Sequence, residues 1–303
     1  MGTRVARGSV AATDDAPEVR PLAVDHEGET VRHGDEIDDP VVVATPLSYN
    51  GPNAASTRID RVRPEGFDIA LEEWDYLDGS HSDESVGCLS VASGVGHLDG
   101  GAMVAAGTVD VGTEEIWTKF GERFSEPPVV LTATQTRNVS RPVVSRVPGV
   151  ARGGFDVLIQ GEEAASIDAA ETVGFVAIER GTGTFGDRQY EAGVERKVDE
   201  DWHTIEFDGE YETPVFLAAM QTANGPDAAT LRYRNLDANS VEVFVQEERS
   251  ADDETRHRAE EVGYVVLDGG IEGDTSPSDG VESTDYGVGG YGVDSYGVED
   301  YGS

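Results

Sequence analysis

The sequence predicts an all-β chain of three tandem antiparallel β-sandwiches, able to stand in a pseudo-threefold arrangement, with disordered termini. The first observation is an internal repeat of 86 to 88 residues, the separations of Arg58, Arg146 and Arg232. The second is the alternation of apolar and polar residues within each copy, in runs rich in Val, Ile, Thr and Phe. The third is that these runs break at Asn-Gly, Pro-Glu-Gly and Arg-Gly-Gly, as strands joined by turns do.

Each copy opens on a proline, with an asparagine ten and an arginine eighteen residues later: Pro40, Asn50 and Arg58; Pro128, Asn138 and Arg146; Pro214, Asn224 and Arg232. Each closes on a Glu-x-x-Gly element, at Glu84, Glu171 and Glu260. In so acidic a chain, we expect the arginine to have a structural role and to pair with a carboxylate such as these three. The asparagine is expected to supply a side-chain hydrogen bond or to tolerate a positive φ.

The elements follow in order along the chain. Residues 1–27 are polar, lack periodicity and are expected to form an N-terminal arm. The three units, with their connectors, span residues 28–112, 113–199 and 200–270, and the connectors at 97–112 and 186–200 have an ordered strand–turn–strand pattern. Residues 271–303 repeat Tyr-Gly-Val in an acidic, glycine-rich context, which predicts disorder. That tail is either a segment that docks on a partner or a solvated end.

The charge balance of the sequence limits which classes of partner the protein can bind. Sixty Asp and Glu against 22 Lys and Arg give a net charge of −38, which excludes nucleic acid. Only Lys119 and Lys197 are lysines, and acid enrichment with lysine loss is typical of a halophile, because molar salt screens the self-repulsion. No run of 18 apolar residues exists, so no membrane insertion is expected, and the N-terminal segment lacks the apolar stretch of a signal peptide.

Nothing in the sequence singles out catalysis. The one cysteine, Cys88, stands in an alternating run and is expected to be a buried small residue. The six histidines share no metal-ligand spacing, and neither a nucleophile motif nor a phosphate-binding loop is present. We therefore expect a protein that is not an enzyme and that needs no cofactor.

The segments PPVVLTATQTRN (127–138), GGFDVLIQGE (153–162) and ETVGFVAIERG (171–181) resemble the H-type lectin repeat, and GFDIALEEW (66–74) resembles it in copy one. The resemblance covers residues 28–93, 113–181 and 200–268. It implies a six-stranded, non-enzymatic sandwich that binds N-acetylgalactosamine-like sugars and associates in threes.

The resemblance also implies where a sugar site would lie. The family's aromatic residue, whose ring face contacts the sugar, corresponds to Trp74, and to a glutamate in each other copy, Glu162 and Glu248. The following family histidine corresponds to Asp75, Glu163 and Arg249, and a ligand-binding arginine to Ala54, Pro142 and Ala228, so neither is retained. The candidate carbohydrate-binding residues are Trp74, Asp75, Asp78 and His81. As an alternative, residues 74–84 form a polar loop in which Asp75, Asp78, His81, Asp83 and Glu84 could hold Ca²⁺.

These observations predict a glycan-recognition or adhesion protein of a haloarchaeal surface assembly or virus particle, with multivalent, individually weak sites. Expected partners are surface glycans or glycoproteins and other subunits of the assembly or virion, in an oligomer. The rival hypothesis is a purely structural component without sugar binding, such as a virion head or tail decoration. Under either hypothesis we expect the protein to be made in a high-salt cytoplasm and to reach the surface without a signal peptide.

Overall fold

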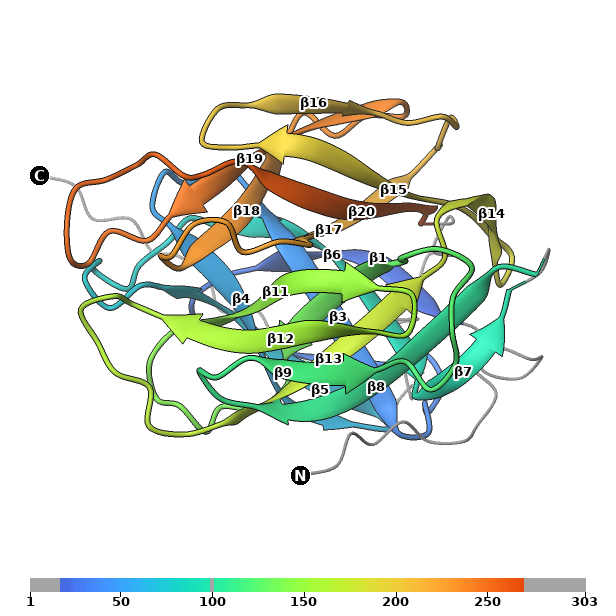
Figure 1. The fold of residues 1–303 in the computed structure, drawn as a ribbon, viewed down its shortest axis with the longest axis horizontal. Helices are drawn as coiled ribbons and strands as arrows, with labels where there is room; N and C mark the ends of the chain where they lie inside the picture. Colours follow the sequence, from blue (N-terminus) through green and yellow to red (C-terminus); the bar gives the residue numbers. More distant parts are fainter. Residues whose placement is uncertain (1–16, 99–100, 270–303) are drawn as a thin grey trace, which may run out of the picture. The chain divides into compact units, whose positions relative to one another are not determined.

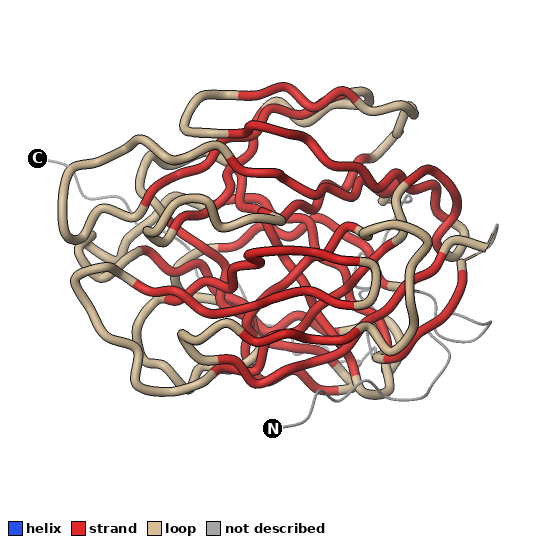
Figure 2. The backbone as a smooth tube through the Cα atoms, viewed as in Figure 1, coloured by secondary structure: helices blue, strands red, loops and turns tan. Residues whose placement is uncertain are grey.

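Strands and turns make up the whole described part of the chain (Figures 1 and 2). The computed structural model describes residues 17–98 and 101–269, which form twenty strands and no helix. The expected all-β class is confirmed. With no helix in these ranges, none is available there to cross a membrane. The Tyr-Gly-Val tail and most of the N-terminal arm lie outside the described residues.

One pattern of six paired strands recurs three times. In copy one the strands are β1 (Glu18–Val24), β2 (Glu29–Arg32), β3 (Pro40–Ser48), β4 (Ala55–Arg63), β5 (Gly66–Glu73) and β6 (Glu84–Ala92). Strands β1, β6 and β3 pair in that order, as do β2, β5 and β4, and both sets are antiparallel.

Copies two and three repeat these pairings. Copy two consists of β8 (Met103–Val111), β9 (Ile116–Lys119), β10 (Val129–Thr134), β11 (Val143–Ala151), β12 (Gly154–Gly161) and β13 (Glu171–Ile178). Copy three consists of β15 (Arg188–Val198), β16 (His203–Glu206), β17 (Pro214–Met220), β18 (Ala229–Arg234), β19 (Ser240–Glu247) and β20 (Glu260–Asp268). The first sheets are ordered β8-β13-β10 and β15-β20-β17, and the second β9-β12-β11 and β16-β19-β18.

The segments between the copies belong to these sheets. Short strands β7 (Gly94–His97) and β14 (Gly181–Phe185) form hairpins with β8 and β15, which pair in turn with β13 and β20. Strand β1 lies within the segment that the sequence predicted as an arm. Its apolar alternation is interrupted by Arg20 and Pro21, although Val19 and Val24 are buried. One pairing departs from the expected antiparallel pattern, because β3 and β18 meet in parallel at Leu47 and Ser48.

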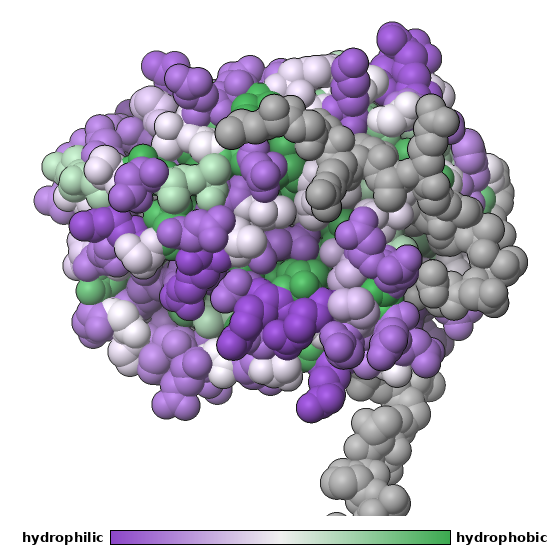
Figure 3. Space-filling model, turned by 90° about the horizontal axis from the view of Figure 1, so that it is seen from below, coloured by the Kyte–Doolittle hydropathy of each residue, from purple (hydrophilic) through white to green (hydrophobic). Residues whose placement is uncertain are grey.

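The first sheet of each copy buries both of its faces. On β10, Val130 packs in a core confined to copy two, whereas its neighbours Val129 and Leu131 join a second core. That second core also holds Val43 of copy one and Val265 of copy three. Successive residues of a strand point to opposite faces, so the first sheets of copies two and three lie between their own core and the shared one. The core of copy one is continuous with the shared core. Outside, hydrophilic residues predominate on the face shown in Figure 3.

Candidate functional site: the junctions between the copies

Three buried arginines join the copies in a closed cycle. Arg58 of copy one pairs with Glu171 of copy two, with 2.6 Å between Nη2 and Oε1. Arg146 of copy two pairs with Glu260 of copy three at 3.2 Å, and Arg232 of copy three returns to Glu84 of copy one at 2.6 Å. The carboxylates are those anticipated from the sequence, and each pair crosses from one copy to the next. The arginines therefore hold the copies together.

The repeated asparagine completes each carboxylate site. The backbone N–H groups of Asn50, Asn138 and Asn224 donate to Glu84, Glu171 and Glu260. Each asparagine side chain donates to the carbonyl oxygen of the residue before that glutamate, at 2.8 to 3.0 Å. A side-chain hydrogen bond, the first of the two roles considered, is what the structure shows, and none of the three has a positive φ.

Glu84 and Glu260 stay charged although they are buried. Burial by itself would raise the pKa of Glu84, but hydrogen bonds from His81, from the Ser48 hydroxyl and from the turn N–H groups outweigh it. The pKa of Glu84 therefore lies below its ordinary value. Glu260 behaves in the same way, with hydrogen bonds from His257 and Thr222 and the charge of Arg146 outweighing its burial.

The glycine of the Glu-x-x-Gly element permits close approach between copies. A Cβ on Gly263 would lie 2.7 Å from the side chain of Gln221, whose amide bonds both the N–H and the C=O of Val130 in copy two, at 2.9 and 2.8 Å. In copy one, a Cβ on Gly87 would lie 2.2 Å from the carbonyl oxygen of Phe216 in copy three. Both ends of the Glu-x-x-Gly element thus contribute to the junctions: the glutamate through its pair with an arginine, and the glycine through close packing.

Trp74 is an interior residue. Its side chain is 1% exposed and packs with Ala54 of its own copy and with Ala228 and Val144 of the other two copies. The expectation that its ring face is open to a sugar is therefore wrong. The ring is covered by Ala54 and Ala228, which directly precede β4 and β18, by Val144 of β11 and by Leu77 of its own loop.

The equivalents of Trp74 explain its unusual site. Glu162 accepts a hydrogen bond from the Tyr76 N–H, and Glu248 accepts one from the Glu163 N–H, each at 3.0 Å across a junction. Trp74 occupies the equivalent position in copy one, but its side chain has no oxygen that could accept a hydrogen bond from the neighbouring copy. Its indole N–H has no hydrogen-bond partner among the described residues.

The remaining candidate sugar ligands do not converge on one binding site. Asp75 pairs with Arg141 of copy two at 2.8 Å, and Asp78 accepts the Ser80 N–H within its own turn. His81 is buried between two carboxylates. Across the described ranges, no three His, Cys, Asp or Glu side chains gather as metal ligands would, so the structure offers no such cluster for Ca²⁺.

A groove at the junction of copies one and three was not predicted. This junction groove has a volume of about 470 Å³, within the size range of small-ligand sites. Copy one contributes Tyr49, Pro52, Asn53, Ala54, Tyr76 and Leu77, and copy three Glu200, Asp201, Phe244, Val245, Gln246, Glu247, Arg249 and Thr255. Sequence comparison of the copies could not find it, because its aromatic residues have no counterparts at matching positions in the other copies.

Aromatic rings form one wall of the junction groove. Tyr49 packs edge-on against Phe244, with 5.4 Å between ring centroids, and Trp202 supports both rings from behind. Tyr76 stands at the groove with 40% of its surface exposed. Glu200, Asp201 and Glu247 against Arg249 leave the lining with an excess of carboxylates. An apolar ring wall with surrounding polar groups suits an uncharged polyhydroxylated ligand better than an anionic one.

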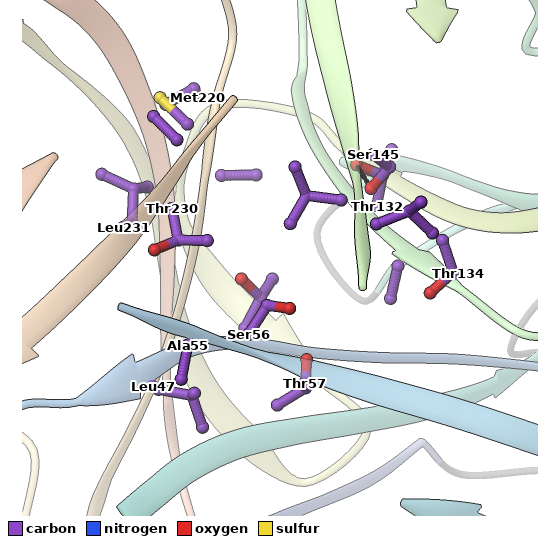
Figure 4. A pocket seen from close by; sticks show the side chains of 16 residues that line it. Leu47, Ala55, Ser56, Thr57, Thr132, Thr134, Ser145, Met220, Thr230 and Leu231 are labelled. Carbon is purple, nitrogen blue, oxygen red and sulfur yellow. Dashed lines mark hydrogen bonds between the residues drawn. The ribbon is translucent and has the colours of Figure 1, made fainter. Parts of the chain in front are cut away.

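A smaller cavity of about 70 Å³ lies where all three copies meet (Figure 4). Ser56, Val144 and Thr230, at equivalent positions of β4, β11 and β18, all line it. Most of its polar groups are hydroxyls, and Ser145 donates to Thr132 there at 2.9 Å. The lining carries no charged side chain, so this cavity is a feature of the interior packing rather than a site for an ion.

Thr230→Val is expected to raise the free energy of unfolding by about 1 kcal/mol, because the Thr230 hydroxyl is buried without a hydrogen-bond partner among the described residues. The matched variant Thr132→Val removes the acceptor of Ser145 and should lower it by about 1 kcal/mol. Urea unfolding in molar salt measures both. Equal losses in the two variants would contradict this account.

Cys88 lies in the shared core, as the sequence predicted. Burial raises the pKa of its thiol to about 12. The thiol is therefore protonated and closed to solvent at neutral pH, which leaves it no role as a nucleophile.

Comparison with known proteins gives one similarity. The chain is 32% identical over 284 residues to halomucin of Haloquadratum walsbyi, an alignment that covers 85% of this chain and 3% of halomucin. It thus spans a small fraction of the length of the protein that it matches. No family model matches the chain, and neither does any solved structure. The resemblance to H-type lectins therefore stays a prediction.

Proposed function

We propose that the chain is a non-catalytic recognition module of a halophilic surface assembly, and that it binds uncharged glycans in the junction groove. Three observations support this: the aromatic wall, the groove's size, and the acidic composition expected of a halophile. The similarity to halomucin supports the surface setting. The groove carries the proposal, because it combines exposed ring surface with polar groups in one concave site.

For the architecture we propose three H-type-lectin-like sandwiches around a pseudo-threefold axis. The recurrence of the same six strand pairings supports it, as does the closed cycle of Arg–Glu pairs. One chain would then stand in for a trimer of single domains. The internal position of Trp74 means that sugar binding in this chain would use other residues than the family's aromatic position.

A glycan array in molar salt tests the binding proposal. Tyr76→Ala and Phe244→Ala should each weaken binding of neutral glycans at least about fivefold, since an aromatic contact of this kind contributes about 1 kcal/mol. Trp117→Ala is the matched control, because Trp117 is 46% exposed on β9 and does not line the groove. Loss of binding in the control, or none in Tyr76→Ala, would contradict the assignment.

The second candidate is a purely structural component, with the three copies as a spacer. The small share of halomucin that the chain matches favours it, since one module among many can serve to extend a long protein. Under this alternative the array shows no glycan above background for either the native chain or its variants. The virus particle as a setting stays a prediction from the sequence.

A further inference from the structure

Two of the three junctions contain a buried histidine. The His81 ring lies between Glu73 and Glu84, with Nδ1 2.8 Å and Nε2 3.0 Å from their Oε1 atoms. The His257 ring is held in the same way by Glu247 and Glu260, the latter at 3.0 Å. The two residues are 6% and 5% exposed, and each ring contacts the glutamate that pairs with a junction arginine.

Copy two lacks the whole arrangement. Gly51 and Gly225 leave room for the rings, since a Cβ on either would lie within 2.9 Å of an imidazole atom. In copy two, the position of Gly51 and Gly225 is occupied by Val139. The position of Glu73 and Glu247 is occupied by a glycine, Gly161. There Ile167 packs over Gly161, and Asp168, in place of the histidine, points to solvent. Copy two therefore differs at all three positions, and Val139 and Ile167 form part of an apolar cluster where the other copies have a polar one.

This distribution makes copy three different from its neighbours. His81 lies at the junction of copies one and three, and His257 at that of copies two and three. The junction of copies one and two, where Arg58 meets Glu171, has neither. Both of the junctions that hold copy three therefore contain a histidine.

We propose that protonation of His81 and His257 closes the two junctions of copy three, and that their deprotonation in the alkaline range loosens both, opening the junction groove. The junction of copies one and two stays closed throughout. The effect on the groove rests on the proposed function, whereas the loosening of the junctions does not.

Charge balance is the physical reason. Around His81 stand Glu73 of β5, Glu84 of β6 and Arg232 of β18, so a protonated ring gives two buried positive against two buried negative charges. Loss of the proton leaves one carboxylate uncompensated in the interior, which is strongly unfavourable.

Around His257 the same balance holds among Glu247, Glu260 and Arg146. Glu200, which accepts the His257 backbone N–H, is partly exposed and has its own partner in Arg256. At the third junction Arg58 faces Glu171, with Glu72 3.9 Å away. This junction therefore has its arginine and its carboxylates but no histidine.

The sign of the effect follows from the pKa shifts. Burial lowers the pKa of each histidine, but the two flanking carboxylates outweigh it, so the pKa of His81 is raised and that of His257 is raised to about 9. An unfolded histidine has a pKa of about 6.5. The stabilisation is therefore complete below about pH 6.5 for both histidines. For His257 it is lost as the pH rises through about 9, and for His81 it is lost as the pH rises above the ordinary range of a histidine pKa.

The junction groove is coupled to both clusters. Glu247, which binds His257, lines the groove directly. Asn53 lines it as well and donates to Glu73, at 2.9 Å, which binds His81. A change in either cluster thus acts on a wall of the groove.

Amide hydrogen exchange of the full chain in molar salt, corrected for the intrinsic pH dependence of exchange, tests the proposal. The N–H groups of Asn50, Gly51, Asn224 and Gly225 donate to the junction carboxylates and report on copy three's contacts. Their protection should fall at least about tenfold between pH 6.5 and 9.5. That of Asn138 and Val139, which donate to Glu171, should not change. An equal fall at all three junctions, or none, would overturn the proposal.

His81→Gln sharpens the test, since glutamine keeps hydrogen-bonding groups but cannot take up the charge. At pH 6.5 it should show at Asn50 and Gly51 the low protection of the native chain at pH 9.5, with no further change. His203→Gln is the control, because His203 pairs with Asp199 while partly exposed. Should His81→Gln not fold, the native profile alone decides.

These measurements need no glycan. If the junctions respond to pH but the chain binds no glycan, the proposed function is refuted and the loosening of the junctions stands. If the chain binds glycans but the junctions do not respond to pH, the proposed function stands and the present inference is refuted.

Discussion

Arg232→Ala is expected to lower the free energy of unfolding by about 3 to 5 kcal/mol. The guanidinium is fully buried, and besides Glu84 it bonds the carbonyl oxygens of Ser48 and Asn53 and the side chain of Gln246. Its loss leaves Glu84 buried without its arginine and removes most of the polar contacts between copies one and three. The free energy of unfolding from urea titration in molar salt measures this loss.

Arg141→Ala provides the matched control. Arg141 also joins two copies, through Asp75 at 2.8 Å, but both side chains are about half exposed. Exposed pairs contribute at most about 1 kcal/mol, and less in molar salt. If the two variants lose similar stability, burial does not govern the strength of the junctions and the structural role given to Arg232 is wrong.

The repeat pattern predicted the class of fold and the importance of Arg58, Arg146 and Arg232, because residues required at every copy are visible as identities at fixed spacing. It could not show that the pairs cross between copies, since the same residues would satisfy an intra-copy pair. Nor did it reveal β1, where Arg20 and Pro21 interrupt the alternation that marks a strand.

The candidate sugar site shows the limit of transferring a site from a family. Exposure of Trp74 depends on which loops contact it, and loop contacts between copies leave no periodic signal in the sequence. The histidine clusters, in contrast, could have been read from the aligned copies. Gly51, Glu73 and His81 recur together as Gly225, Glu247 and His257, and all three are replaced together in copy two.

Trp74→Ala is expected to lower the free energy of unfolding by about 3 to 5 kcal/mol, because it empties a fully buried site that touches all three copies. Trp74→Phe should cost clearly less, since it keeps most of the apolar volume and removes an indole N–H that lacks a partner among the described residues. Urea unfolding in molar salt measures both variants.

Glycan binding separates this packing role from a role in recognition. Trp74→Phe should bind as the native chain does, because the junction groove is lined by Tyr49, Tyr76 and Phe244 and not by Trp74. A Trp74→Ala chain with native stability and no glycan binding would show instead that the ring meets the ligand. In that event the segments that carry Ala54, Val144 and Ala228 would have to separate from the ring in solution, and the packing of Trp74 against them would not be its resting state.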